Sequence, residues 1–248
     1  MLFRSLVRAF NATAVGGLLN YYKLTPEGFR RVQGVEAELP PRSFFAEIAP
    51  SRFMHTLTVA EVIVQTIVAA HDFRIEVGCF HREHELVLEA AGQMLIPDCH
   101  FLLTSAGKHF QVLFEIDNST ETIDSFSHQS IKNKLLGYDT YQDGVLAGWA
   151  KAGRDGSRPA FRVAFLTKTA ERAEHILSLA NELARNRDRR LFVAATQDAF
   201  LAERDALREP IFLDHFGGLL PLVNPHPTAA SSKPFIRLRL AIAPQTIV

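Results

Sequence analysis

Apolar runs and segments with helical spacing alternate along the chain, which predicts a mixed α/β fold with a central mixed sheet flanked by helices. Short apolar runs predict strands over 18–24, 73–80, 161–167 and 191–195, and residues 85–89 are expected to extend the sheet edge. Helices are predicted over 1–10, from Pro26 onward, over 58–70, over 128–141 and after Thr169. The helix over 58–70 is apolar nearly all round and is expected to be buried, residues 144–159 are expected to form a loop, and an edge strand is expected over 235–242. The strand, helix and strand between residues 161 and 195 predict a parallel pair.

Residues 96–117 form the most informative stretch, two apolar strands joined by a turn at 105–108. Asp98 and Glu115 are equidistant from the centre of that turn, so they are expected to be cross-strand partners, about 5 Å apart at Cβ. Asp117 faces the same way because strand side chains repeat with period two. The pattern therefore predicts three carboxylates at one end of a hairpin.

Carboxylates held this close repel one another unless a cation lies between them. Hard divalent ions with oxygen ligands, Mg or Mn, suit such a cluster. The alternative is a hairpin end whose acids are simply solvated, and a turn of a different length would also remove the facing arrangement.

The predicted helix over 128–141 carries Lys134, Tyr138 and Tyr141 at i, i+4 and i+7, on one face. Lys132 points away from that face by roughly 160°. If the helix packs across the sheet, the Lys134 side chain can point toward the carboxylates. The alternative is a solvated lysine above two half-buried tyrosines.

Composition limits the classes of protein that this chain can belong to. Its 248 residues are 47% hydrophobic with a formal net charge of zero, which allows one sizeable core and excludes a global polycation. Two cysteines give no disulfide framework, and we identify no signal peptide and no apolar run of membrane-spanning length. We therefore expect a cytoplasmic protein without a membrane partner.

Positive charge is concentrated locally. Before residue 35 the only acid is Glu27, against Arg4, Arg8, Lys23, Arg30 and Arg31, which indicates a phosphate-bearing partner. The alternative is an N-terminal helix that packs on the main domain or mediates a dimer. A second group, Arg185, Arg187, Arg189 and Arg190, is either a solvated helix end or a phosphate-facing patch.

Two further groups have both structural and chemical interpretations. Glu61 lies three residues after Thr58, which fits a capping box better than a metal ligand. A soft metal site is an alternative to ordinary burial for Cys79, His81, His84, Cys99 and His100, although their spacing fits no strong zinc pattern.

Several motifs occur together in a family-specific order, and their resemblance covers about residues 20–200. Leu24-Thr25-Pro26-Glu27-Gly28 after a strand resembles the wing and last helix of a winged helix-turn-helix domain. Pro97-Asp98, then Glu115-Ile116-Asp117, then Lys134 with Tyr138 resemble the PD-(D/E)xK nuclease core and, more narrowly, the replication-relaxation family of plasmid-associated proteins. The expected organisation is a partial winged-helix-like segment (1–34), a linker (35–52), a restriction-endonuclease-like αβββαβ domain (53–200) and a C-terminal extension (201–248).

The resemblance implies that Asp98 and Glu115 bind Mg or Mn, with Asp117, Glu85 or Glu61 completing the site. In such nucleases a lysine usually follows the glutamate by two residues; here that place is Asp117, and Lys134 is expected to supply the ammonium instead. Tyr138 and the N-terminal basic residues are expected to contact DNA.

The implied function is metal-dependent nicking or cleavage of DNA. The alternatives are a catalytically inactive DNA-binding regulator, working with replication or mobilisation proteins, and a homodimeric scaffold that does not touch DNA.

Overall fold

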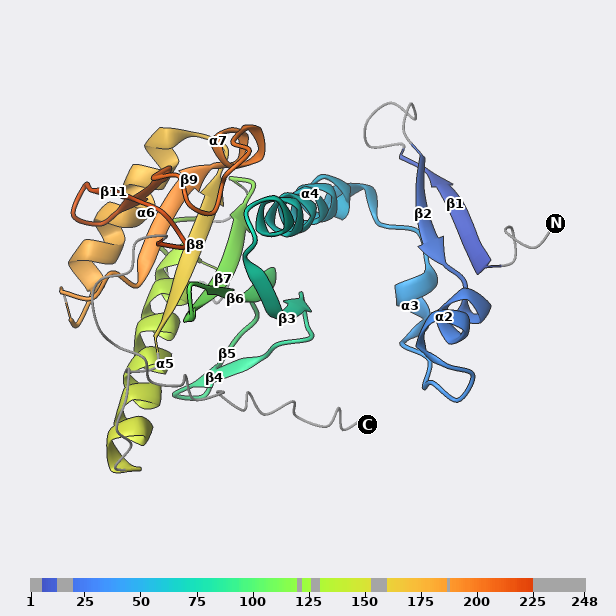
Figure 1. Ribbon diagram of the computed structural model, residues 1–248, viewed down its shortest axis with the longest axis horizontal. Coiled ribbons are helices and arrows are strands. Elements are labelled where there is room, and N and C mark those ends of the chain that lie inside the picture. The colour runs from blue at the N-terminus through green and yellow to red at the C-terminus, as the bar shows by residue number, and fades with distance from the viewer. Residues whose placement is uncertain are drawn as a thin grey trace. The chain divides into compact units, whose positions relative to one another are not determined.

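The computed structural model describes residues 6–12, 20–119, 122–125, 130–152, 160–186 and 188–224, apart from the side chain of Trp149. The chain divides into two compact units, Met1–Thr58 and Val59–Val248 (Figure 1). Each unit is described by itself below.

The smaller unit pairs two antiparallel strands, β1 (Val7–Asn11) and β2 (Asn20–Leu24), and adds α2 (Pro26–Gln33) and α3 (Arg42–Phe45). The predicted strand over 18–24 is confirmed from residue 20. The predicted helix over 1–10 is wrong from residue 7, because this segment pairs with β2 and Phe10 stacks on Tyr21. Residues 1–5 and 18–19 lie outside the described part.

Helix α2 begins where the sequence predicts. Thr25 has extended backbone, and its Oγ1 accepts a hydrogen bond of 3.1 Å from the backbone N–H of Gly28, so it caps the helix. Pro26 occupies the first turn, where its missing N–H costs nothing.

The larger unit is built on a seven-stranded mixed sheet in the order β11-β10-β9-β8-β7-β6-β3. Strands β3, β6 and β7 form an antiparallel meander, β7, β8 and β9 are parallel, and β10 is antiparallel to β9. The predicted parallel pair is therefore confirmed. The strands are β3 (Glu76–Arg82), β6 (Cys99–Ser105), β7 (Lys108–Asp117), β8 (Phe161–Thr167), β9 (Phe192–Thr196), β10 (Phe212–Asp214) and β11 (Leu219–Leu220).

Helices flank this sheet (Figure 1). One hydrophobic cluster joins Val62 of α4 (Pro50–Asp72) and Phe200 of α7 (Gln197–Ala202) to Phe114 of β7. Another cluster joins Leu135 of α5 (Ile131–Lys151) and Ile176 of α6 (Ala170–Leu183) to the sheet. Phe114 and its neighbour Leu113 belong to different clusters, so alternate residues of β7 face opposite sides.

Helix α4 differs from its prediction at both ends and on its surface. It begins at Pro50, inside the predicted linker, so Thr58 is an interior residue whose hydroxyl donates to the carbonyl of Met54, and the predicted capping box is wrong. The expected burial on all sides is also wrong, because Val64 and Ile67 are exposed.

By length and composition, α4 is also apolar enough to cross a membrane, contrary to the expectation that the chain has no such run; among the described helices no other qualifies. Core helices of soluble proteins meet the same criterion, and Val62 and Ala69 of α4 are fully buried in the core.

Other differences reflect tertiary packing. Residues 88–95 do not extend the main sheet; they form a separate hairpin, β4 (Leu88–Ala90) with β5 (Gln93–Leu95), which packs on α5. Helix α5 continues to Lys151 through Gly144 and Gly148, which were expected in a loop. Strands β10 and β11 were not predicted, and the expected strand over 235–242 lies outside the described residues.

Candidate functional site

The register of the β6–β7 hairpin is set by its turn. Ala106 and Gly107 both have positive φ, 49° and 73°, the requirement of a two-residue turn that matches the twist of a hairpin. The pairs run from Ser105 opposite Lys108 to Cys99 opposite Phe114. Asp98 lies one residue beyond the last pair; its backbone N–H donates to the carbonyl of Phe114 at 3.0 Å and its Oδ2 accepts from the N–H of Ile116, so it lies beside Glu115.

Glu115 is the centre of a buried polar cluster. Its side chain is 2% exposed, Nζ of Lys134 lies 2.9 Å from its Oε2, and the hydroxyl of Tyr138 donates to its Oε1 at 2.5 Å. Lys134 and Tyr138 are one turn apart on α5, and they come from the face that the spacing predicts. The fully buried Tyr138 is therefore an internal partner of Glu115 in this structure, not an exposed residue.

The electrostatics of Glu115 follow from this burial. The pKa of Glu115 is raised to about 7, chiefly because burial removes its carboxyl group from water; nearby Asp98 acts in the same direction. The Lys134 ammonium and the Tyr138 hydroxyl act in the opposite direction by stabilising the carboxylate. Glu115 can therefore take up or release a proton near neutral pH.

The other two predicted acids of the hairpin have internal partners. Oδ2 of Asp98 accepts a hydrogen bond of 2.6 Å from the backbone N–H of Ile116, which pins its side chain to β7. Asp117 receives both Nε and a terminal nitrogen of Arg172, from the first turn of α6. The carboxylate of Asp117 is thus neutralised by an arginine.

Two predicted ligands are placed elsewhere. Glu85 lies in the turn after β3, where it binds Arg82 through two guanidinium N–H groups and the backbone N–H. Glu61 is exposed on α4, whose buried residues pack on the face of the sheet opposite to Glu115.

Sequence reasoning missed Arg172 and the buried ion pair of Arg189 with Asp139. A usable signal for Arg172 was present. Parallel β7 and β8 pair Asp117 with Thr167, and only two residues separate β8 from α6, so the first turn of α6 comes to the strand end where Asp117 lies.

The described nucleic-acid-binding candidates of the smaller unit are spread over three elements, β1, β2 and α2. Arg8 of β1 is exposed and pairs across the strands with Lys23, and Arg30 and Arg31 are exposed on α2. Lys23 donates to the carbonyl of Ala46 at 2.7 Å. Arg4 lies outside the described residues.

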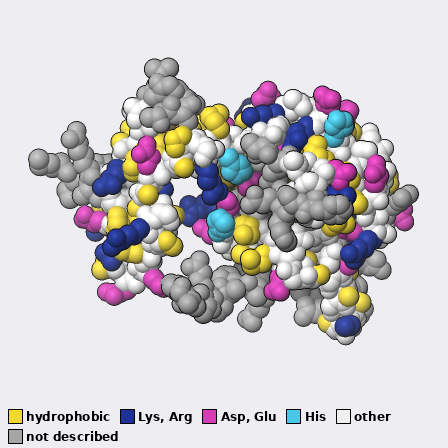
Figure 2. All heavy atoms as spheres, turned by 180° about the vertical axis from the view of Figure 1, so that it is seen from behind, with side chains coloured by type: hydrophobic (Ala, Val, Ile, Leu, Met, Phe, Trp, Pro, Cys, Tyr) yellow, Lys and Arg dark blue, Asp and Glu magenta, His cyan; other side chains and the backbone are white. Residues whose placement is uncertain are grey.

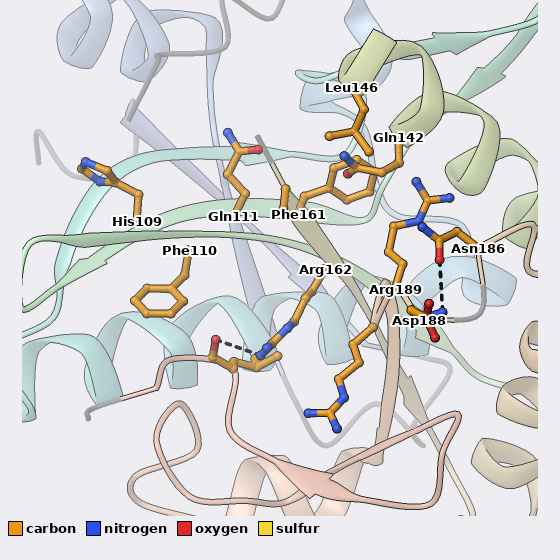
Figure 3. Close-up of a pocket in the computed structure, with 13 residues that line it drawn as sticks. His109, Phe110, Gln111, Gln142, Leu146, Phe161, Arg162, Asn186, Asp188 and Arg189 are labelled. Carbon is orange, nitrogen blue, oxygen red and sulfur yellow. Dashed lines mark hydrogen bonds between the residues drawn. The ribbon is translucent and has the colours of Figure 1, made fainter. Parts of the chain in front are cut away.

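A pocket of about 420 Å³ lies at the opposite end of β7 and β8 from Glu115 (Figure 3). Its guanidinium groups already bind protein oxygens: Arg162 the Pro221 carbonyl, Arg189 two aspartates and Arg190 Asp214. Of the predicted basic group, Arg185, Arg189 and Arg190 are thus paired with aspartates, and Arg187 lies outside the described residues. The lining includes His109, Phe110, Gln111, Gln142, Leu146, Phe161, Asn186 and Asp188.

A third group of side chains gathers on the edge of the sheet. The ligand atoms of Cys79, His81 and His100 all lie within 4.8 Å of one another. Burial, and then the neighbouring His81, lower the pKa of His100 to about 4. Of the other two residues considered for a soft metal site, Cys99 is in the core cluster on the opposite face and His84 pairs with Glu83 in the turn.

The fold and the cluster define a class: a mixed α/β protein whose meander presents a buried glutamate to a lysine and a tyrosine of the next helix. The model of the family described as replication-relaxation matches residues 4–153, more than half of the chain, so this protein belongs to the replication-relaxation family. No curated protein and no solved structure matches the chain. Membership suggests a role in plasmid replication or mobilisation, and involvement with DNA and its replication or mobilisation machinery.

Proposed function

We propose that this protein binds DNA through its N-terminal unit and nicks or cleaves DNA phosphodiesters at a metal-dependent, PD-(D/E)xK-like site. The observation that carries the proposal is the buried Glu115 carboxylate with the Lys134 ammonium at 2.9 Å and with Asp98, bound to the next residue Ile116, beside it. Two carboxylates and a lysine are the groups that such a reaction needs.

The order of elements supports a restriction-endonuclease-like core. Helix α4 precedes the antiparallel meander β3, β6 and β7, and α5, β8, α6 and β9 follow. Pro97-Asp98 immediately precedes the second strand of the meander, and Glu115 lies on the third. These are the positions of the acidic motif in the fold that the sequence resembles.

Lys134 takes the role of the lysine that usually stands two residues after the glutamate. Asp117 stands there instead, held by Arg172. The long side chain of Lys134 extends from α5 to Glu115 on β7, so the ammonium and the carboxylate are in contact although they come from different elements.

The donor set fits Mg or Mn, because the side chains of Asp98 and Glu115 offer carboxylate oxygens. These two residues would hold the ion; Asp117 and Glu85 would join it only by leaving Arg172 and Arg82. When bound, the ion would lower the pKa of a water molecule and stabilise negative charge on the phosphodiester. Lys134 would orient the attacking group and neutralise charge beside Glu115.

DNA contact is assigned to the exposed basic residues Arg8, Arg30 and Arg31 of the smaller unit. Their strand pair followed by a capped basic helix supports a winged-helix-like element. Figure 2 shows basic and acidic side chains interspersed over the visible face of the larger unit, without a continuous basic field. Affinity should therefore come from a few phosphate contacts and fall with added salt.

A second function, a catalytically inactive DNA-binding regulator, is favoured by one observation. Glu115 and Asp98 are only 2% and 8% exposed, and both already have hydrogen-bond donors within the protein. A phosphodiester could reach them only if the cover over the site moved.

The test is incubation of the purified protein with supercoiled plasmid in Mn, Mg or EDTA. The variants Glu115→Gln and Asp98→Asn are run beside Glu89→Gln, an exposed residue of β4 that serves as a matched control. Conversion to open-circle or linear DNA is expected with metal, and to be lost in the first two variants but kept in the third. Intact plasmid together with a metal-independent gel shift at low salt would replace the nuclease with the regulator.

A further inference from the structure

We propose that Cys79, His81 and His100 form a binding site for a zinc-type transition-metal ion, separate from the carboxylate pair. Cys79 and His81 lie on the edge strand β3, and His100 lies on its neighbour β6. The site is carried by the convergence of three nitrogen and sulfur ligands on a rigid pair of strands.

The strand register explains why they converge. His81 is directly opposite His100, and Cys79 is opposite Leu102, two residues along. Period-two alternation puts all three side chains on one face, the side away from the core residues Cys99 and Phe101. The pairs from Cys79 to Arg82 are in one continuous register, and the register shift lies before them, between Val77 and Cys79.

The distances are close to those of a metal site. Nδ1 of His81 and Nδ1 of His100 are 3.1 Å apart, and the three ligand atoms span at most 4.8 Å. Tetrahedral bonds of about 2.0–2.3 Å place neighbouring ligand atoms roughly 3.3–3.8 Å apart. Small rotations of the half-buried Cys79 and His81 side chains would close the remaining difference.

The ligand types select the metal. A thiolate and two imidazoles suit zinc, cobalt or copper, whereas Mg and Mn prefer the oxygen ligands offered by Asp98 and Glu115. The protein would thus hold two chemically different cation sites on one face of the sheet. Three protein ligands leave a fourth position for water or an incoming group.

A hydrogen bond between the two histidines would explain their contact, but it would not require the Cys79 thiol to converge on the same point. The two explanations predict different results with a soft metal ion: the metal site binds it through the Cys79 thiolate, whereas a histidine–histidine hydrogen bond does not. The zinc-type site also stands independently of the nuclease proposal, because its binding is measured without DNA and without Mg or Mn.

The experiment is titration of the metal-free, full-length, reduced protein with Co²⁺, followed by displacement with Zn²⁺. One equivalent of Co²⁺ should give visible d–d bands of a tetrahedral centre and an ultraviolet thiolate-to-cobalt band, and Zn²⁺ should remove both. Cys79→Ser should abolish the thiolate band, and both Cys79→Ser and His81→Asn should weaken Zn²⁺ binding at least about tenfold. His109→Gln, at an exposed residue of β7, is the matched control and should bind as the wild type does.

Circular dichroism of each variant distinguishes loss of a ligand from loss of the fold. If Cys79→Ser does not fold, His81→Asn is the second variant, because His81 lies on the edge strand of the sheet. A thiolate band that survives in Cys79→Ser would overturn the assignment. So would a wild-type protein that gives no cobalt spectrum, or one whose Zn²⁺ affinity is unchanged in His81→Asn.

Discussion

Nζ of Lys134 lies 2.9 Å from Oε2 of Glu115, although nineteen residues separate the two in the chain. The contact joins α5 to β7 at the point where the hairpin carries its acids. Tyr138, one turn further along α5, binds the other oxygen of the same carboxylate. Helix α5 is therefore part of the candidate site as well as a cover for the sheet.

Glu115 should make stability depend on pH in an identifiable direction. Its pKa is raised to about 7 in the folded protein from an ordinary value of 4.5, so the folded state binds this proton more tightly than the unfolded chain does. Stability from this group is full below about pH 4.5 and is lost as the pH rises through about 7. Because one pKa unit corresponds to about 1.4 kcal/mol, the wild type should lose on the order of 3 kcal/mol across this interval, and Glu115→Gln should not show this loss.

The measurement is urea unfolding of the wild type and Glu115→Gln at several values of pH between 4.5 and 8, without divalent metal. The free energy of unfolding of the variant, relative to the wild type, should rise with pH. A difference that is constant over this range would contradict the assignment of the raised pKa to Glu115.

Lys134 and Lys132 allow a matched comparison of charge on one helix. Lys134→Met removes the ammonium beside Glu115, and metal-dependent nicking should fall about 100-fold or more, as when one charge-stabilising group is removed from an active site. Lys132 binds Asp124 instead, so Lys132→Met should leave nicking within about twofold of the wild type. Rates of plasmid conversion measure both. Equal rates in the two variants would remove Lys134 from the mechanism.

Arg172 should matter for stability because its partner is buried. Arg172→Met leaves the carboxylate of Asp117 in the interior without its cation, which should cost about 3–5 kcal/mol. Arg204 pairs with Asp72 at the surface, where water screens the charges, so Arg204→Met should cost much less than Arg172→Met. Chemical denaturation compares the two variants. Similar small losses would mean that Asp117 finds water or another partner.

Gly28 and Gly144 should respond oppositely to the same substitution. A Cβ at Gly28 would lie 1.9 Å from the backbone oxygen of Leu6, so Gly28→Ala must displace the chain next to β1 and destabilise the smaller unit. A Cβ at Gly144 of α5 meets nothing within 4 Å, so Gly144→Ala should stabilise the protein by about 1 kcal/mol through helix propensity. Thermal unfolding measures both. A Gly28→Ala protein as stable as the wild type would show that this close approach is not needed.

Local chemistry made part of the fold predictable. The turn at Ala106-Gly107 requires positive φ, and the caps at Thr25 and Thr169 need only a hydroxyl and the next turn of helix, so all three could be located from neighbouring residues. Prediction from neighbouring residues alone was wrong at the start of α4. Thr58 looks like a helix start by sequence, but α4 had already begun at Pro50.

The sequence by itself determined the hairpin register from Ser105 opposite Lys108 to Cys99 opposite Phe114, and with it the closeness of Asp98 to Glu115, because a short turn and period-two alternation leave little freedom. It also determined that Lys134 and Tyr138 share a helix face. Only the tertiary structure decided that this face packs on Glu115, that Arg172 reaches Asp117, and that Cys79 meets two histidines. These contacts join segments distant in the chain, and their geometry follows from how layers and strands pack against one another, which local spacing does not encode.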